Sequence, residues 1–381
     1  MKNRAGNTVQ NLTGEAAYYS YYPQPLPPEP DIDNDAEMQR LLIEAHKSLA
    51  LLNGLSDRIP DRDLFISMYV RKEALVSSQI EGTQCTLEDV FDPDADENAN
   101  ADVSDVVNYV RAVNYALERM KELPLCSRLV REIHAVLMNS VRGGDKTPGE
   151  FRTSQNWIGG VGSALKNARF IPPNPRDMKD CMSDLERYMN DDDDTDSLVK
   201  AALVHYQFET IHPFLDGNGR VGRLLITLFL IYQKALSSPV LYLSCFLKQN
   251  RIEYYDRMSE VRHSGNYEQW IKFFLLGVAE TSREATETID RLTELRRKNR
   301  AKLSGLPARS LQNILALFDY IERNPIIKTV KTAADLGLSE NGTAKYIKLL
   351  CDRDILINTG KSGKALLFAY RDYLDILRKD T

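Results

Sequence analysis

The stretch HPFLDGNGRVGR, residues 212–223, is the segment that decides how this chain folds and what it binds. It runs directly into LLITLFLIY, residues 224–232, and the apolar residues of both segments follow a helical spacing. Gly217 and Gly219 are therefore predicted at the N-terminus of a helix, where N–H groups and the helix dipole favour anions. Glycine also lets a ligand approach the backbone closely, because it has no side chain.

Charged residues in the same stretch predict phosphate chemistry. Arg220 and Arg223 are three residues apart, so they share one face of the first helical turn. Two guanidiniums beside a helix dipole favour a multiply charged anion over a single carboxylate. Asp216 beside phosphates is consistent with Mg²⁺, which binds one or two carboxylates plus phosphate oxygens. His212 has the chemistry to accept a proton from an attacking hydroxyl at neutral pH.

Each of these features also has an ordinary structural explanation. A lone Gly-Asn-Gly is usually a turn, and a lone histidine near a helix end is usually a core or surface residue. Pro213 and Phe214 are interpreted as structural, and His134 and His205 as satisfied core or cleft-edge histidines because their neighbours are apolar. The joint occurrence of the remaining residues favours function, because no fold needs all of them for packing.

Bulk composition excludes several classes of protein. With 381 residues the chain is long enough for two or three domains, and 43% hydrophobic and 27% charged residues are ordinary for a globular protein. A net charge of −5 gives no whole-protein attraction to nucleic acid or to anionic membranes. The five cysteines are isolated and lack ligand-like spacing, which favours a reducing compartment. We expect a cytoplasmic protein without a signal peptide or a membrane-spanning helix.

The sequence predicts a mainly α chain. Residues 1 to about 35 are polar and then Pro-rich, so they are expected to be extended and to lie along another surface. Two helices follow up to about residue 90, and the acidic stretch 92–105 is expected to be a loop and a helix cap. Helices dominate from 104 to 300. The exception is GEFRTSQNWIGGVGSALKNARFIPPNP, residues 149–175, whose glycine clusters and aromatic residues indicate a hairpin or flap.

The composition changes after Pro307. Helical patterns at residues 310–324, 329–337 and 343–354 are followed by two β-like runs within residues 355–370. Helix, turn, helix and hairpin is the order of a winged helix. The tail carries an excess of about three positive charges, so DNA binding and protein contacts are equally compatible with it.

The segment SSQIEGT, residues 77–83, ends the second predicted helix. Gly82 is an ordinary helix stop, because glycine accepts the left-handed conformation cheaply. Glu81 is unusual there, because a carboxylate in the last helical turn costs roughly 0.3–1 kcal/mol. An exposed glutamate tolerates that cost, so Glu81 can be an ordinary surface residue. The alternative interpretation is that Glu81 pairs with a cation elsewhere in the chain.

HPFLDGNGRVGR matches every position of HPF-x-(D/E)-GN-(G/K)-R-x-x-R, the signature of the Fic family. The resemblance covers roughly residues 10–300 and includes the order of helices, the flap and SPVLYLSCFLKQNRIEYYDRM, residues 238–258. Fic proteins typically transfer AMP from ATP to a hydroxyl side chain of a target protein. The resemblance implies an N-terminal arm and inhibitory-helix region (1–103), a Fic core with a β-hairpin flap (104–303) and a small winged-helix-like domain (304–381).

The resemblance also implies roles for single residues. His212 would be the catalytic general base, and Asp216 would bind the Mg²⁺ that bridges the α- and β-phosphates. Arg223 would lie nearest the γ-phosphate, and the flap at 157–172 would align the target backbone by strand addition. The implied ATP-binding set is Glu81, His212, Gly217, Asn218, Gly219, Arg220, Val221, Gly222, Arg223 and Asn250.

SSQIEG also matches the inhibitory pattern of the family, (S/T)-x-x-x-E-(G/N), with Ser77, Glu81 and Gly82 at the defining positions. Glu81 would pair with Arg223 in place of the γ-phosphate, and in some relatives this glutamate also activates water to remove AMP. Self-modification and a homodimer are further expectations from the family. Two alternatives stay open: a transcription regulator that acts through the C-terminal domain, and a transferase that uses another donor.

Overall fold

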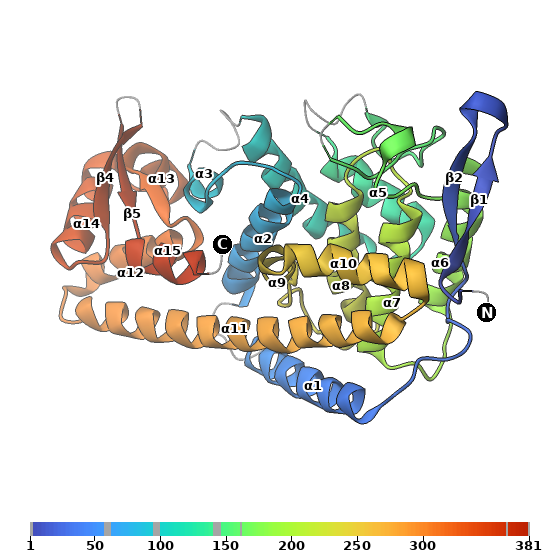
Figure 1. Ribbon diagram of the computed structural model, residues 1–381. Coiled ribbons are helices and arrows are strands. Elements are labelled where there is room, and N and C mark those ends of the chain that lie inside the picture. Colours follow the sequence, from blue (N-terminus) through green and yellow to red (C-terminus); the bar gives the residue numbers. More distant parts are fainter. Residues whose placement is uncertain are drawn as a thin grey trace. The chain divides into compact units, whose positions relative to one another are not determined.

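The computed structural model describes residues 3–56, 62–93, 100–139, 146–160, 162–362 and 365–379. Within these residues helices dominate and two small sheets are present (Figure 1). The predicted mainly α fold is therefore confirmed. The expected helix start at Asp61, the middle of the acidic stretch, Val161 of the flap and Gly363 lie outside the described residues.

The chain forms two compact units. The first contains Met1–Asn53 and Asn108–Arg283, and the second contains Gly54–Val107 and Glu284–Thr381. The division falls within three helices, which are α1 (Ala36–Ser56), α4 (Ala101–Arg119) and α11 (Tyr267–Lys302). The domain boundaries expected after residues 103 and 303 stay a prediction.

The first unit begins with a hairpin. Strands β1 (Gly6–Asn11) and β2 (Tyr18–Pro23) pair antiparallel and are joined by a 3-10 turn. The sequence predicted only an extended arm here. The expected docking is present, because the backbone N–H of Tyr21 donates to the Ile171 carbonyl at 2.9 Å.

The core of the first unit is helical. Helix α7 (Ser197–Ile211) packs against α8 (Asn218–Tyr232), and the segment 212–223 lies at the junction of these two helices. Both helices are apolar around most of their circumference, which is typical of helices buried on all sides. The further helices of this unit are α5 (Ser127–Leu137), α6 (Pro175–Asn190), α9 (Ser244–Gln249) and α10 (Arg251–Ser264).

The second unit joins two helices from early in the sequence to the C-terminal part of the chain. Helix α2 (Arg62–Ile80) contacts α12 (Ala308–Arg323), and α3 (Leu87–Phe91) lies after α2 in sequence. The buried Lys72 Nζ donates to the backbone carbonyl of Lys379 at 2.7 Å. A cation beside the last carbonyls of a helix is favourable, because the helix dipole is negative there.

The C-terminal residues of the second unit contain the expected order of helix, turn, helix and hairpin. A three-stranded antiparallel sheet in the order β3-β5-β4 accompanies these helices, and its strands β3 and β5 contact α13. Strand β3 and the last helix, α15, were not predicted. The elements are β3 (Ile326–Lys328), α13 (Thr329–Asp335), α14 (Glu340–Asp352), β4 (Ile357–Ser362), β5 (Ala365–Ala369) and α15 (Arg371–Arg378).

Among the described residues, no helix combines the length and the apolar character that crossing a bilayer requires.

Candidate functional site

His212 ends helix α7 in an unusual backbone conformation. Its φ and ψ are 51° and 60°, in the left-handed region, and its N–H donates to the Phe208 carbonyl at 2.9 Å. A non-glycine residue held there is uncommon and points to a local requirement. The Nδ1 atom lies 3.4 Å from the Glu209 carbonyl oxygen. Because a carbonyl only accepts, Nδ1 carries the proton and Nε2 is left as the basic nitrogen.

The side chain of Asn218 closes the loop that follows His212. Its Oδ1 accepts the Phe214 N–H at 2.8 Å, and its Nδ2 donates to the Phe214 carbonyl at 2.9 Å. The side-chain amide therefore holds the loop in shape. Contact of Asn218 with a nucleotide stays a prediction.

Gly217 caps helix α8 at the predicted place. Its φ of 77° is left-handed, and an added Cβ would lie 2.8 Å from the Met138 sulfur. The first intrahelical bond runs from the Val221 N–H to the Gly217 carbonyl at 3.1 Å, so the three preceding N–H groups belong to the helix N-terminus. Asp216 is exposed beside them, and its Oδ1 accepts the Gly217 N–H at 2.6 Å.

The two predicted arginines come from the first turns of α8. Arg220 and Arg223 are buried, with 6% and 3% of their surface exposed. The Arg220 guanidinium lies 3.4 Å from the Met138 sulfur. Two buried positive charges and a helix N-terminus therefore occupy the same short segment as Asp216. Anion binding by this segment stays a prediction.

Two of the residues assigned to ATP binding are packed into the core. Val221 is 2% exposed. At Gly222 an added Cβ would lie 2.2 Å from Oε1 of Glu209, so the glycine lets α8 approach α7. The Gly222 carbonyl also accepts the Nδ1–H of His205 at 2.9 Å. Contact of either residue with a nucleotide stays a prediction.

His205 and His134 are both satisfied, as the sequence indicated. His205 Nε2 accepts the Tyr254 hydroxyl at 2.8 Å, and burial lowers its pKa to about 4, with the positive Arg223 adding to the effect. His134 lies under the loop, where its Nε2–H donates to the Asp216 carbonyl at 3.0 Å. Burial also lowers the pKa of His134 to about 4, so both rings are neutral at physiological pH.

The expected flap is a short hairpin. Ile158 and Phe170 exchange both backbone hydrogen bonds, at 2.8 and 3.0 Å. In such a pair the neighbouring N–H and C=O groups point outward, so Trp157 and Gly159 present theirs along the free edge. Trp157 is 41% exposed, and its Nε1–H donates to the Ser163 carbonyl at 3.1 Å.

Sequence reasoning missed two residues at the base of this flap. Arg152, which is 1% exposed, donates from Nε to the His212 carbonyl at 2.9 Å. Asn156 donates from Nδ2 to the Phe214 carbonyl at 2.8 Å. No local signal marks them, because their acceptors lie about 60 residues later in the chain.

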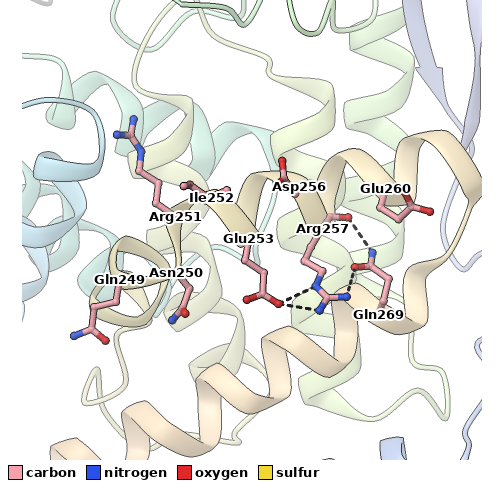
Figure 2. Close-up of a pocket in the computed structure, with 9 residues that line it drawn as sticks. All are labelled: Gln249, Asn250, Arg251, Ile252, Glu253, Asp256, Arg257, Glu260 and Gln269. Carbon is pink, nitrogen blue, oxygen red and sulfur yellow. Dashed lines mark hydrogen bonds and ion pairs between the residues drawn. The ribbon is translucent and has the colours of Figure 1, made fainter.

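Asn250 connects α9 to α10, and its Nδ2 donates to the Phe246 carbonyl at 2.9 Å. Asn250 lines an open pocket of about 730 Å³ on α10, where Arg257 reaches toward Glu253 and Gln269 (Figure 2). Residues 212–223 are not among the residues that line this pocket, so the nucleoside contact stays a prediction.

The segment SSQIEGT, residues 77–83, belongs to the second unit. Gly82, with φ 100°, follows helix α2, and the N–H groups of Gly82 and Thr83 donate to Gln79 and Ser78 at 3.1 and 3.2 Å. These two hydrogen bonds form the Schellman motif at the end of a helix, in which Glu81 is the C-cap residue. Glu81 is exposed and Ser77 is fully buried. Arg223 belongs to the first unit, and its pairing with Glu81 stays a prediction.

A histidine, a glycine-capped helix N-terminus and a hairpin bonded to the loop between them characterise this site. Residues 39–118 match the description "Fic/DOC family N-terminal", and residues 124–230 match "Fic/DOC family". These two segments therefore match the N-terminal and Fic domains of the Fic/DOC family, which confirms the resemblance inferred from the motif.

Curated relatives are named "Protein adenylyltransferase Fic". Those of Culex quinquefasciatus and Drosophila melanogaster are both 35% identical over 127 residues, or 33% of this chain. The match covers 22% and 23% of the relatives, so the chain spans less than a quarter of their length. A crystal structure of a Fic family protein from Desulfovibrio desulfuricans has a TM-score of 0.58 and 20% identity, and the likeness covers 90% of this chain and 98% of that one. At this identity the likeness shows the fold alone.

Proposed function

We propose that this chain transfers AMP from ATP to a hydroxyl group of a target protein and releases pyrophosphate. The observation that carries the proposal is the junction of α7 and α8. A half-buried imidazole, an exposed carboxylate and two buried guanidiniums share this short segment at a glycine-capped helix N-terminus. The name of the curated relatives supports the same activity.

In the proposed reaction the hydroxyl oxygen of the target attacks the α-phosphorus of ATP. A new O–P bond forms, the bond from the α-phosphorus to the β-phosphate oxygen breaks, and pyrophosphate leaves. Nε2 of His212 accepts the hydroxyl proton, because Nδ1 is the protonated nitrogen. The N–H groups at the start of α8 and the guanidiniums of Arg220 and Arg223 bind the phosphate oxygens.

Mg²⁺ fits the donor set at this segment. Asp216 offers one exposed carboxylate at the helix N-terminus, with one of its oxygens already oriented by the Gly217 N–H. When bound with ATP, the ion neutralises phosphate charge. Asp216 would be the protein ligand, with phosphate oxygens and water supplying the remaining ligands.

The flap is proposed to bind the target through its main chain. The outward N–H and C=O groups of Trp157 and Gly159 can accept an extended segment as an added strand. Recognition of main chain encodes little side-chain preference, so the target is selected by its local extended shape and by contacts beyond the flap.

Glu81 is proposed to hold the enzyme in an inhibited state by pairing with Arg223 in place of the γ-phosphate. A charge-assisted Arg–Glu pair is stronger than a neutral hydrogen bond, which outweighs the cost of a carboxylate at a helix end. Removal of AMP from a modified target is proposed as a second, Glu81-dependent activity. Its test is AMP release from a purified modified target, which must disappear when Glu81 is replaced.

The decisive test of the main proposal uses ATP labelled at the α-phosphate. The Glu81→Gly protein is incubated with Mg²⁺ and a cell lysate, and labelled proteins are separated and analysed by mass spectrometry. AMP on Ser, Thr or Tyr hydroxyls supports the proposal. Parallel incubations with labelled GTP, UTP and CTP test the donor, and labelling from one of these alone would replace ATP in the proposal.

A second candidate function rests on the C-terminal elements. Helices α13 and α14 followed by the hairpin β4–β5 have the order of a DNA-binding winged helix. A gel-shift titration of the full chain against duplex DNA at increasing salt tests this function, because phosphate contacts weaken steeply with salt. Binding that does not respond to salt would favour a protein-contact role for these elements.

A further inference from the structure

Arg152 is a buried cation whose bonds converge on backbone carbonyls. Its Nε donates to the His212 carbonyl at 2.9 Å, and Nη2 donates to the carbonyls of Ile211, at 3.4 Å, and Pro173. Nη1 lies 3.4 Å from the Ser154 carbonyl. The acceptors Ile211 and His212 lie at the C-terminal end of α7. The acceptors Ser154 and Pro173 lie at the two ends of the flap.

The chemistry of this position requires a guanidinium. Five N–H donors in a fixed plane can serve several carbonyls at once, whereas a lysine ammonium is a single point on a flexible stem. The last carbonyls of α7 carry the negative end of the helix dipole, so they are suitable partners for a buried cation. Burial lowers the pKa of Arg152 to about 10, and the side chain therefore stays charged at neutral pH.

Asn156 makes a second connection between the same two places. Its Nδ2 donates to the carbonyls of His212 at 3.3 Å and Phe214 at 2.8 Å. The backbone N–H of Arg152 also donates to the Pro213 carbonyl at 2.9 Å. The carbonyls of three consecutive residues, from 212 to 214, are therefore all held from the base of the flap.

We propose that Arg152 and Asn156 are positioning residues that couple the flap to the catalytic histidine. They hold the backbone of His212 in its left-handed conformation and thereby orient the imidazole toward a hydroxyl presented on the flap. This inference rests on the proposed AMP transfer. Neither side chain is assigned contact with ATP or with the reacting atoms.

The coupling predicts that its loss changes kcat and the KM for ATP to different extents. The phosphates of ATP bind at the start of α8, whereas the coupling acts on the residues before it. Loss of the coupling should therefore lower kcat and leave the KM for ATP nearly unchanged. A side chain with a merely structural role would not separate the two constants.

The first experiment uses Asn156→Asp in the Glu81→Gly background. This change keeps the shape of the side chain but turns a carboxylate oxygen toward carbonyl oxygens. The matched control is Asn190→Asp, the same chemical change in α6, where Nδ2 donates to the carbonyls of Leu125 and Glu186 at 2.8 Å. We expect Asn156→Asp to lower kcat by about tenfold to a hundredfold, and Asn190→Asp to change it by less than about threefold.

Arg152→Lys and Arg152→Met test the cation. We expect Lys to retain more kcat than Met, because it keeps the charge and part of the donor capacity. If Arg152→Met does not fold, the comparison of Asn156→Asp with Asn190→Asp still decides. Equal kcat for the two amide variants, or a rise in the KM for ATP with kcat unchanged, would overturn the proposal.

Hydrogen exchange supplies a readout that does not depend on activity. Amides in residues 211–219 should exchange faster in Asn156→Asp than in Asn190→Asp, because the loop loses its connection to the flap. Equal exchange in both variants would also overturn the coupling. If the Glu81→Gly protein transfers no nucleotide, the proposed function fails, and the exchange comparison still tests the coupling separately.

Discussion

The ring of His134 lies parallel to the ring of Phe214, with 3.7 Å between their centroids and 2° between their planes. The same imidazole donates to the Asp216 carbonyl and accepts the Gly149 N–H at 2.9 Å. A doubly protonated ring could not accept from Gly149, so this arrangement requires the neutral form. His134 therefore supports the candidate loop as a neutral ring.

We expect the protein to lose stability as the pH falls from about 6.5 to about 4. Burial lowers the pKa of His134 to about 4 in the folded state, whereas the unfolded chain binds the proton near pH 6.5. The unfolded state binds more protons in this window, so stability present above it is lost as the pH falls, on the order of 3 kcal/mol. Chemical denaturation across this pH range measures the loss. His134→Gln should show a shallower decline, and an identical slope would contradict the assignment.

His212→Asn should remove the general base and leave the backbone intact. Asparagine tolerates the left-handed conformation better than most residues, so the φ of 51° can be kept. We expect AMP transfer to fall by about 10²–10⁴-fold, the usual contribution of a general base, with the affinity for Mg-ATP unchanged. Single-turnover labelling and calorimetric titration with ATP measure the two quantities.

The matched control for that experiment is His263→Asn. His263 is an exposed histidine in α10 whose Nδ1–H donates to the Ser259 carbonyl at 2.7 Å. Because it lies outside the candidate loop, its replacement should leave labelling at the level of the parent protein. Equal losses in both variants would remove His212 from the role of base.

Glu81→Gly should raise AMP transfer. A charge-assisted hydrogen bond contributes about 1.5–3 kcal/mol, so releasing Arg223 to the γ-phosphate is expected to increase the rate about tenfold to a hundredfold. Self-labelling with ATP labelled at the α-phosphate measures the change, and Glu88→Gln provides a control in α3, where Glu88 pairs with Arg378. Equal labelling by the parent and by Glu81→Gly would count against the inhibitory role.

Gly222→Ala should destabilise the first unit. The new Cβ would meet Oε1 of Glu209 at 2.2 Å and Cδ1 of Phe208 at 3.1 Å, and the buried carboxylate has to move. We expect a loss of about 1–3 kcal/mol in the free energy of unfolding, as for other overpacked cores. Gly54→Ala is the control, because that exposed glycine of α1 has open space around it and should gain about 0.5–1 kcal/mol. Denaturant titration that shows the same sign for both would refute the packing argument.

Local patterns in the sequence were sufficient for the helical core, the flap and the helix N-terminus at Gly217. The apolar period of α8, the glycine stop after α2 and the glycine clusters of the flap act over a few residues, so they can be read without the fold. The hairpin β1–β2 and the strand β3 were missed. The short β3 is defined by its pairing with β5, about 40 residues away in the chain, and the hairpin lies on the Ile171 segment far from it in sequence.

The sequence by itself determined which chemical groups gather near residue 212, because histidine, aspartate, glycine and arginine follow one another within a single turn and a helix start. The tertiary structure alone decided how those groups are held. Arg152, Asn156 and His134 reach the loop from distant segments, and the Asn218 amide bonds back to Phe214 within it. Buried polar groups must find partners wherever the fold brings a carbonyl or an N–H close, and that proximity is set by packing between segments far apart in the chain.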